Sequence, residues 1–277
     1  MAERLVMIGR GLGAAVMAVF LAGCPQRADE PAPPVEPTEQ PTPEPAPVPT
    51  PTTLSRADLL TAARQAASAY ALGQAPQAST TLMGRTFSVA IPVGCGGPVA
   101  SLPQDASDGL ARVAWGPERR TIQFSLSPGD WTESPLITGA GGEWESVEGV
   151  WLPRPWLDAE GCPTVRADPL QSGQVPVTPQ TVGMAVVHTA DDSRVDRRNG
   201  RAWAFTLRGE GEAAPVVAAQ GWRVRFEGRV TGFPDGRAFR CRAAGPDALP
   251  VCVAAVQLDR VALEGADGAV LSEWRIG

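Results

Sequence analysis

The stretch WRVRFEGRV, from Trp222 to Val230, gives the clearest indication of how this chain folds. Apolar side chains take every second position up to Phe226, and charged side chains take the positions between them. Successive side chains of a strand point to opposite faces of a sheet, so this alternation predicts a half-buried β-strand.

Similar alternation extends outward from this stretch in both directions. Further strands are expected at Phe87–Val93, Ile122–Leu126, Val182–His188, Arg201–Leu207, Phe239–Cys241 and Val251–Leu263, with a last one ending at Ile276. Turn-forming residues separate several of them, at Gly116–Arg119, Phe233–Arg237 and Gly265–Gly268. Residues 80–277 are therefore expected to be mainly β, an antiparallel sandwich or barrel. This region could divide into two halves near 170–180, and the C-terminal half could form an OB-like barrel.

One helix is expected before the strands, over residues 54–73. Ser55 is a good N-cap, Asp58 stands where it completes a capping box, and Gly73 is a suitable stop. The amphipathic, alanine-rich segment carries a narrow stripe of mostly small side chains: Leu59, Ala62, Ala63, Ala66 and Tyr70. The stripe is expected to pack on its own domain, and the alternative is a partner helix from a larger assembly.

Residues 24–53 form a proline-rich linker between the extreme N-terminus and this helix. Proline at this density favours the extended polyproline II form, which reaches ~90 Å at ~3.1 Å per residue. We interpret the linker as a stalk, and the alternative is a docking site for a proline-recognition domain.

The N-terminal 24 residues have the pattern of an export signal. Arg4 and Arg10 flank a short apolar stretch that ends in LAGC, residues 21–24. This ending resembles the lipobox of bacterial lipoproteins. The resemblance implies that residues 1–23 are removed, that Cys24 carries the lipid, and that the chain is anchored in the bacterial envelope. Since Pro25 is not the aspartate that favours the inner membrane, an outer membrane location facing the periplasm is expected. The alternative is an ordinary secretory signal.

Four cysteines remain when Cys24 is set aside: Cys95, Cys162, Cys241 and Cys252. An exported chain meets an oxidising compartment, so an even number of cysteines predicts disulfides. Three pairings are possible, and Cys95–Cys162 with Cys241–Cys252 is favoured because each bridge then stays within one half. A metal site is the weaker alternative because the CxxC spacing is missing.

Composition excludes several classes of function. The formal net charge is −6, which argues against general binding of nucleic acid. All 24 basic residues are arginine, a bias that a GC-rich genome explains. His188 is the only histidine, so sites that need two histidine ligands are excluded. No cofactor is expected.

Arginines on the polar phase of the C-terminal strands form the main candidate site. They are Arg223, Arg225, Arg229, Arg240 and Arg242. A face of guanidinium groups suits phosphate or carboxylate ligands, such as the polyanions of an envelope. The alternative is a solvated sheet face that acidic neighbours neutralise.

Signals for catalysis are weaker. His188 lies near Asp191, Asp192 and Ser193, but no GxSxG motif identifies a nucleophile. A second cluster places glutamates beside tryptophans, namely Glu143, Glu145 and Glu148 with Trp144 and Trp151. The leading hypothesis is therefore a non-enzymatic binding or scaffolding domain. The alternatives are an envelope hydrolase using Glu145 or His188, and a subunit of an envelope assembly.

Overall fold

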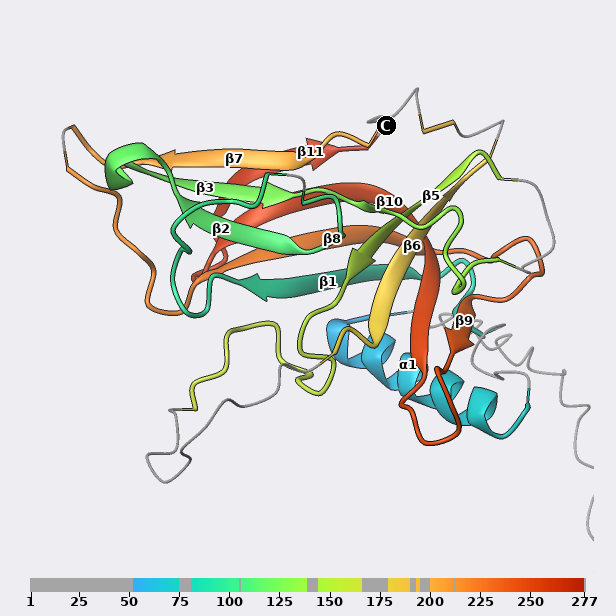
Figure 1. Cartoon of the computed structure of the whole chain (residues 1–277). Coiled ribbons are helices and arrows are strands. Elements are labelled where there is room, and N and C mark those ends of the chain that lie inside the picture. The colour runs from blue at the N-terminus through green and yellow to red at the C-terminus, as the bar shows by residue number, and fades with distance from the viewer. Residues whose placement is uncertain are drawn as a thin grey trace, which may run out of the picture. The chain divides into compact units, whose positions relative to one another are not determined.

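The computed structural model of the chain describes residues 52–74, 81–104, 106–138, 144–165, 179–189, 193–194, 200–211 and 213–276. The predicted signal, Cys24 and nearly all of the linker lie outside these residues. The described part is mainly β, with two sheets and one α-helix near its beginning, as the sequence predicts (Figure 1).

Helix α1 (Arg56–Ala71) starts as expected, with Ser55 as N-cap and a complete capping box formed with Asp58. Its alanine stripe is buried, and α1 packs on strands β9, β10 and β1 of its own domain. Tyr70, at the end of the stripe, is 40% exposed. The stripe therefore serves the core, while the last turn of α1 reaches the surface.

The larger sheet has the order β1-β8-β10-β6-β5-β4, with β9 and β11 also paired to β10. The strands are β1 (Thr86–Val93), β4 (Gly129–Asp130), β5 (Ser146–Trp151), β6 (Val182–His188), β8 (Trp222–Val230), β9 (Phe239–Arg242), β10 (Val251–Gly265) and β11 (Val270–Arg275). Residues Trp222–Val230 form β8, whose burial alternates as predicted. Position 228 of β8 is buried, and a Cβ atom there would collide with the backbone oxygen of Gln257. This position therefore requires glycine.

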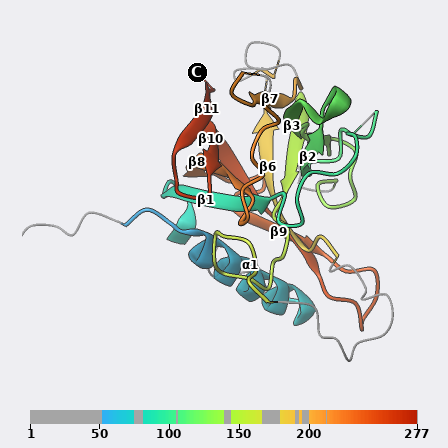
Figure 2. The same ribbon diagram turned by 90° about the vertical axis from the view of Figure 1, so that its left-hand side faces the viewer.

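The smaller sheet contains β2 (Ala111–Trp115), β3 (Thr121–Leu126) and β7 (Trp203–Arg208), in the order β2-β3-β7. The predicted turn at Gly116–Arg119 joins β2 to β3 through a short 3-10 helix, Pro117–Arg119. Aromatic contacts link the apolar faces of the two sheets: the rings of Phe124 and Trp222 lie 4.9 Å apart, edge to face. The fold is therefore a sandwich with α1 packed beside the larger sheet (Figure 2).

Strand β10 is the longest strand and organises both ends of the larger sheet. Residues 251–254 pair with β9, and residues 256–265 pair with β8. The parallel strand β6 lies along the opposite edge at residues 252–256. Strand β9 therefore continues the β8 edge, but its four residues pair with no other described strand.

Two finer expectations about the β region need correction. Strands from before and after residues 170–180 pair directly, since β1 pairs with β8 and β3 with β7. The described residues, from 52 to 276, all belong to one compact unit. The C-terminal strands are part of the open sheet with β1, so they do not form a separate OB-like barrel.

Both favoured disulfides, Cys95–Cys162 and Cys241–Cys252, are present. The second is a cross-strand bridge, because Cys241 lies directly opposite Cys252 in the β9–β10 pair.

The outer edge of β1 is covered by hydrogen bonds from outside the sheet. The amide of Leu54 donates to the carbonyl of Thr86, and the amide of Ser88 donates to the carbonyl of Leu54, both at 2.9 Å. Further along, the amide of Ala90 donates to the carboxylate of Glu160 at 3.1 Å. A sheet edge that would otherwise offer free amides is thereby satisfied.

Candidate functional site

Two of the predicted arginines lie in an internal ionic network. Arg225 donates to Glu264 at 2.7 Å and to Glu160 at 3.2 Å, and Arg223 lies 3.6 Å from the same Glu264 carboxylate. Glu264 is only 5% exposed, and its hydrogen bond to Arg225 raises the pKa of that arginine. These guanidinium groups are engaged within the fold.

Arg56, which the sequence analysis missed, supports this network from the start of α1. Its fully buried guanidinium donates to the carbonyls of Pro153, Arg154 and Leu157 at 2.8–3.1 Å, and to that of Ala90 at 3.4 Å. Burial lowers its pKa to about 10, against the attraction of Glu160, so the group stays charged at neutral pH. Arg56 therefore fixes residues 153–157 against β1.

Carboxylates also neutralise the next part of the same sheet face. Arg260 pairs with Glu227 at 3.1 Å and with Glu273 at 2.8 Å. Arg229, about half exposed, lies 3.6 Å from Asp259. Near β8, acidic neighbours thus neutralise the predicted arginine face.

The two arginines of β9 stand apart from this network and clamp a loop. Arg242 donates to the carbonyl of Pro135 at 3.0 Å, and Arg240 donates weakly to that of Thr138 at 3.5 Å. Arg240 also pairs with Asp235 at 2.8 Å. Within the described residues, no carboxylate forms an ion pair with Arg242, whose side chain is exposed. By register all five predicted arginines lie on the same face of the larger sheet, but they fall into two groups with different partners.

A cavity of about 270 Å³ opens beside β9. The last turn of α1, the loop after β4 and the β9 region line it together. Its polar lining residues are Tyr70, Gln74, Thr138, Arg237, Arg240 and Arg242. Arg237 is another residue that our candidate set missed; it is 57% exposed and lies 3.9 Å from Asp235.

Charge in this cavity is unbalanced. Three guanidinium groups line it, and in the described part of the chain Asp235 is the one carboxylate that pairs with them. Each guanidinium has five N–H donors, of which Arg242 uses one on Pro135. The cavity thus offers about two uncompensated positive charges and spare donors, which suits an anion.

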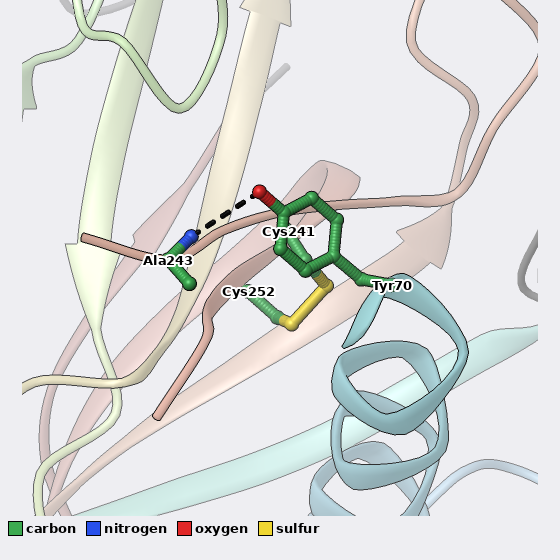
Figure 3. Close-up of a disulfide and its surroundings, with 4 residues drawn as sticks. All are labelled: Tyr70, Cys241, Ala243 and Cys252. Atoms are coloured by element: carbon green, nitrogen blue, oxygen red, sulfur yellow. Dashed lines mark hydrogen bonds between the residues drawn. A yellow bond between two sulfur atoms is a disulfide. The ribbon is translucent and has the colours of Figure 1, made fainter. Parts of the chain in front are cut away.

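The Cys241–Cys252 disulfide and Tyr70 hold β9 in place. Cys241 stands between Arg240 and Arg242, so the bridge ties this pair to the central strand β10. Figure 3 shows Tyr70 reaching from α1 over the disulfide, with its hydroxyl accepting a 3.4 Å hydrogen bond from the amide of Ala243. A four-residue strand with one partner is marginal by itself, so these links fix the positions of its arginines.

Among the described residues, those named for catalysis do not come together in an accessible site. His188 and Glu148 are buried, with Nε2 of His188 3.5 Å from the Glu148 carboxylate, and Arg194 lies 3.9 Å from its other oxygen. Glu145, in contrast, is exposed. The remaining partners named with them are distributed as follows: Asp191, Asp192 and Glu143 lie outside the described residues, while Ser193, Trp144 and Trp151 are partly buried.

Two other kinds of site are absent from the described residues. No group of three or more histidine, cysteine, aspartate or glutamate side chains there could hold a metal ion. No helix in that part is both long and apolar enough to cross a membrane.

Comparison with known proteins gives no assignment. No protein family, curated protein or solved structure matches the chain.

Proposed function

We propose that this chain is a non-enzymatic, lipid-anchored protein of the bacterial envelope, whose β domain binds an anionic envelope component. The arginine-lined cavity beside β9 carries the proposal, because it combines accessible volume with uncompensated positive charge. The lipobox-like LAGC at residues 21–24 supports the anchor. Two disulfides support an oxidising compartment such as the periplasm.

The binding part is tested by charge reversal at two exposed cavity residues. The full chain carrying Arg237→Glu and Arg242→Glu is compared with wild type for binding to lipid A vesicles and to peptidoglycan sacculi at low and physiological salt. Binding to at least one of the two should fall by at least about tenfold, since each charged hydrogen bond contributes ~1.5–3 kcal/mol.

The matched control carries Arg120→Glu and Arg229→Glu. These side chains are 76% and 51% exposed, do not line the cavity, and give the same change in net charge. Equal losses in both double variants would mean that the net charge of the chain, rather than the cavity, governs binding.

The anchor is tested separately by intact-mass spectrometry of native protein and of a Cys24→Ser variant. The wild-type chain should begin at Cys24 and carry two or three acyl chains, and the variant should carry none. A wild-type chain with unmodified Cys24 would refute the lipid anchor without affecting the anion site.

A further inference from the structure

An apolar groove of about 230 Å³ lies beside the arginine-lined cavity. Its apolar walls come from α1, from the segment after β5, from the start of β6 and from the segment before β10: Ala63, Ala67, Trp156, Val182, Leu249 and Pro250. Trp156 is 57% exposed and Leu249 is 66% exposed, so two large apolar side chains stand at the surface here. Arg64, the charged residue of the lining, is paired with Asp158 at 3.2 Å.

The groove and the cavity follow one another along the same side of α1. Ala63 and Ala67 line the groove, and Tyr70 lines the cavity. Residues at i, i+4 and i+7 share one face of a helix, and seven residues span about 10 Å. Cys252 lines the groove and Cys241 lines the cavity. The disulfide that joins these two residues (Figure 3) therefore lies at the boundary.

From this arrangement we infer that groove and cavity together bind one anionic amphiphile, with its phosphate head group in the cavity and its acyl chain in the groove. The inference rests on the proposed function, because it assigns a ligand class to the same arginines. A phosphomonoester carries about −1.5 to −2 charges at neutral pH, which complements the excess positive charge of the cavity better than one carboxylate does. A chain without polar atoms suits walls of alanine, proline, leucine and tryptophan.

Size supports a ligand that occupies both spaces. Pockets for small molecules usually measure ~300–1,000 Å³. Neither space reaches that range alone, at about 270 and 230 Å³, whereas together they come to roughly 500 Å³. A free phosphate would use the cavity only and leave the exposed tryptophan and leucine uncovered.

The test is calorimetric titration of the unlipidated full chain, Cys24→Ser, with three probes: inorganic phosphate, octyl phosphate below its micelle concentration, and octanol. Octyl phosphate should bind at least about tenfold more tightly than inorganic phosphate, because burial of its chain adds affinity, and octanol should bind more weakly than octyl phosphate.

Variants separate the two parts of the site. Leu249→Ser should remove most of the advantage of octyl phosphate and leave the affinity for inorganic phosphate unchanged. Arg242→Gln should weaken both phosphates. Val216→Ser, at an 86% exposed position away from the groove, is the matched control and should change neither.

The outcomes distinguish this inference from the proposed function. Equal affinity for the two phosphates, or equal effects of Leu249→Ser and Val216→Ser, would overturn the amphiphile while leaving the anion site in place. Octanol binding as tightly as octyl phosphate would overturn the role of the head group. Failure of every phosphate and of both envelope polyanions to bind would refute the proposed function and this inference together.

Discussion

Two regions of this molecule each combine arginines with a disulfide, but the arginines have different partners. In one region they are paired within the fold, and in the other they line a cavity. Near β1 and β8, Arg56 and Arg225 are surrounded by carbonyls and carboxylates, and Cys95–Cys162 links the end of β1 to the segment that follows residue 160. Around β9, Arg237 and Arg242 line a cavity in which Asp235 is the one paired carboxylate among the described residues, and Cys241–Cys252 fixes the strand. The comparison shows that the partners of an arginine, more than its place in a strand pattern, decide whether it is structural or free to bind.

Removal of the disulfides should give the largest losses of stability. It should also distinguish the two regions, because only one of the two bridges supports the cavity. On the chain-entropy model, Cys95→Ala with Cys162→Ala should lower the free energy of unfolding by about 4 kcal/mol, because the bridge closes a long loop. Cys241→Ala with Cys252→Ala should cost about 3 kcal/mol and also weaken phosphate binding, because the β9 arginines lose their support. Urea unfolding and calorimetry measure the two quantities. Unchanged phosphate affinity in the second variant would show that β9 keeps its place without the bridge.

Arg56→Met should destabilise the protein by about 3 kcal/mol. The substitution leaves four carbonyl groups without their buried donor, and each uncompensated group costs ~1–3 kcal/mol before the structure relaxes. Urea unfolding of the variant and of wild type measures the difference. A loss below about 1 kcal/mol would mean that water replaces the guanidinium and that this network is less rigid than its geometry indicates.

A matched pair of glutamine substitutions tests whether an arginine paired within the fold and an arginine lining the cavity have different roles. Arg225→Gln should lower the free energy of unfolding by about 2 kcal/mol, because Glu264 loses its closest counterion, and should leave phosphate affinity unchanged. Arg242→Gln should change stability by less than about 0.5 kcal/mol and should weaken phosphate binding. If both variants lost binding equally, the two regions would act as one electrostatic unit.

The smallest effect is expected at the capping box of α1, the helix that reaches both regions. Hydrogen bonding to Ser55 lowers the pKa of Asp58 below its usual 3.8, so the folded state favours the ionised carboxylate. Its contribution should be present above pH 3.8 and should be lost as the pH falls through the lowered value. Asp58→Asn should therefore be less stable than wild type by ~0.5–1 kcal/mol at pH 7. The difference should shrink in thermal melts below about pH 4, and a constant difference would contradict the assignment.

Features that depend on nearby residues could be predicted from the sequence. The alternation of Trp222–Val230 predicted β8, Ser55 and Asp58 predicted the start of α1, and the even number of exported cysteines predicted two disulfides, whose favoured pairing is the one present. Such features depend on neighbours within a few residues or, for the disulfides, on few possible pairings. They are therefore visible without the fold.

The organisation of the site was less accessible, because it depends on contacts between distant segments. Glu160 binds Arg225 from 65 residues away, and Arg56 donates to Leu157, which is 101 residues away. No local sequence pattern therefore indicates that these two arginines have hydrogen-bond partners within the fold. Tyr70 stood out only as the last residue of a helical stripe, and its role beside Arg242 emerges when α1 packs near β9. The polar phase of a strand identifies which side chains leave the core but not what they meet.

The covered edge of β1 has a consequence for a protein crowded beside its own copies. A bare strand edge can recruit another chain and extend the sheet from molecule to molecule. Here Leu54 and the Glu160 carboxylate already occupy the amides of Ser88 and Ala90. Copies at high local density should therefore resist joining through this edge into fibrous aggregates.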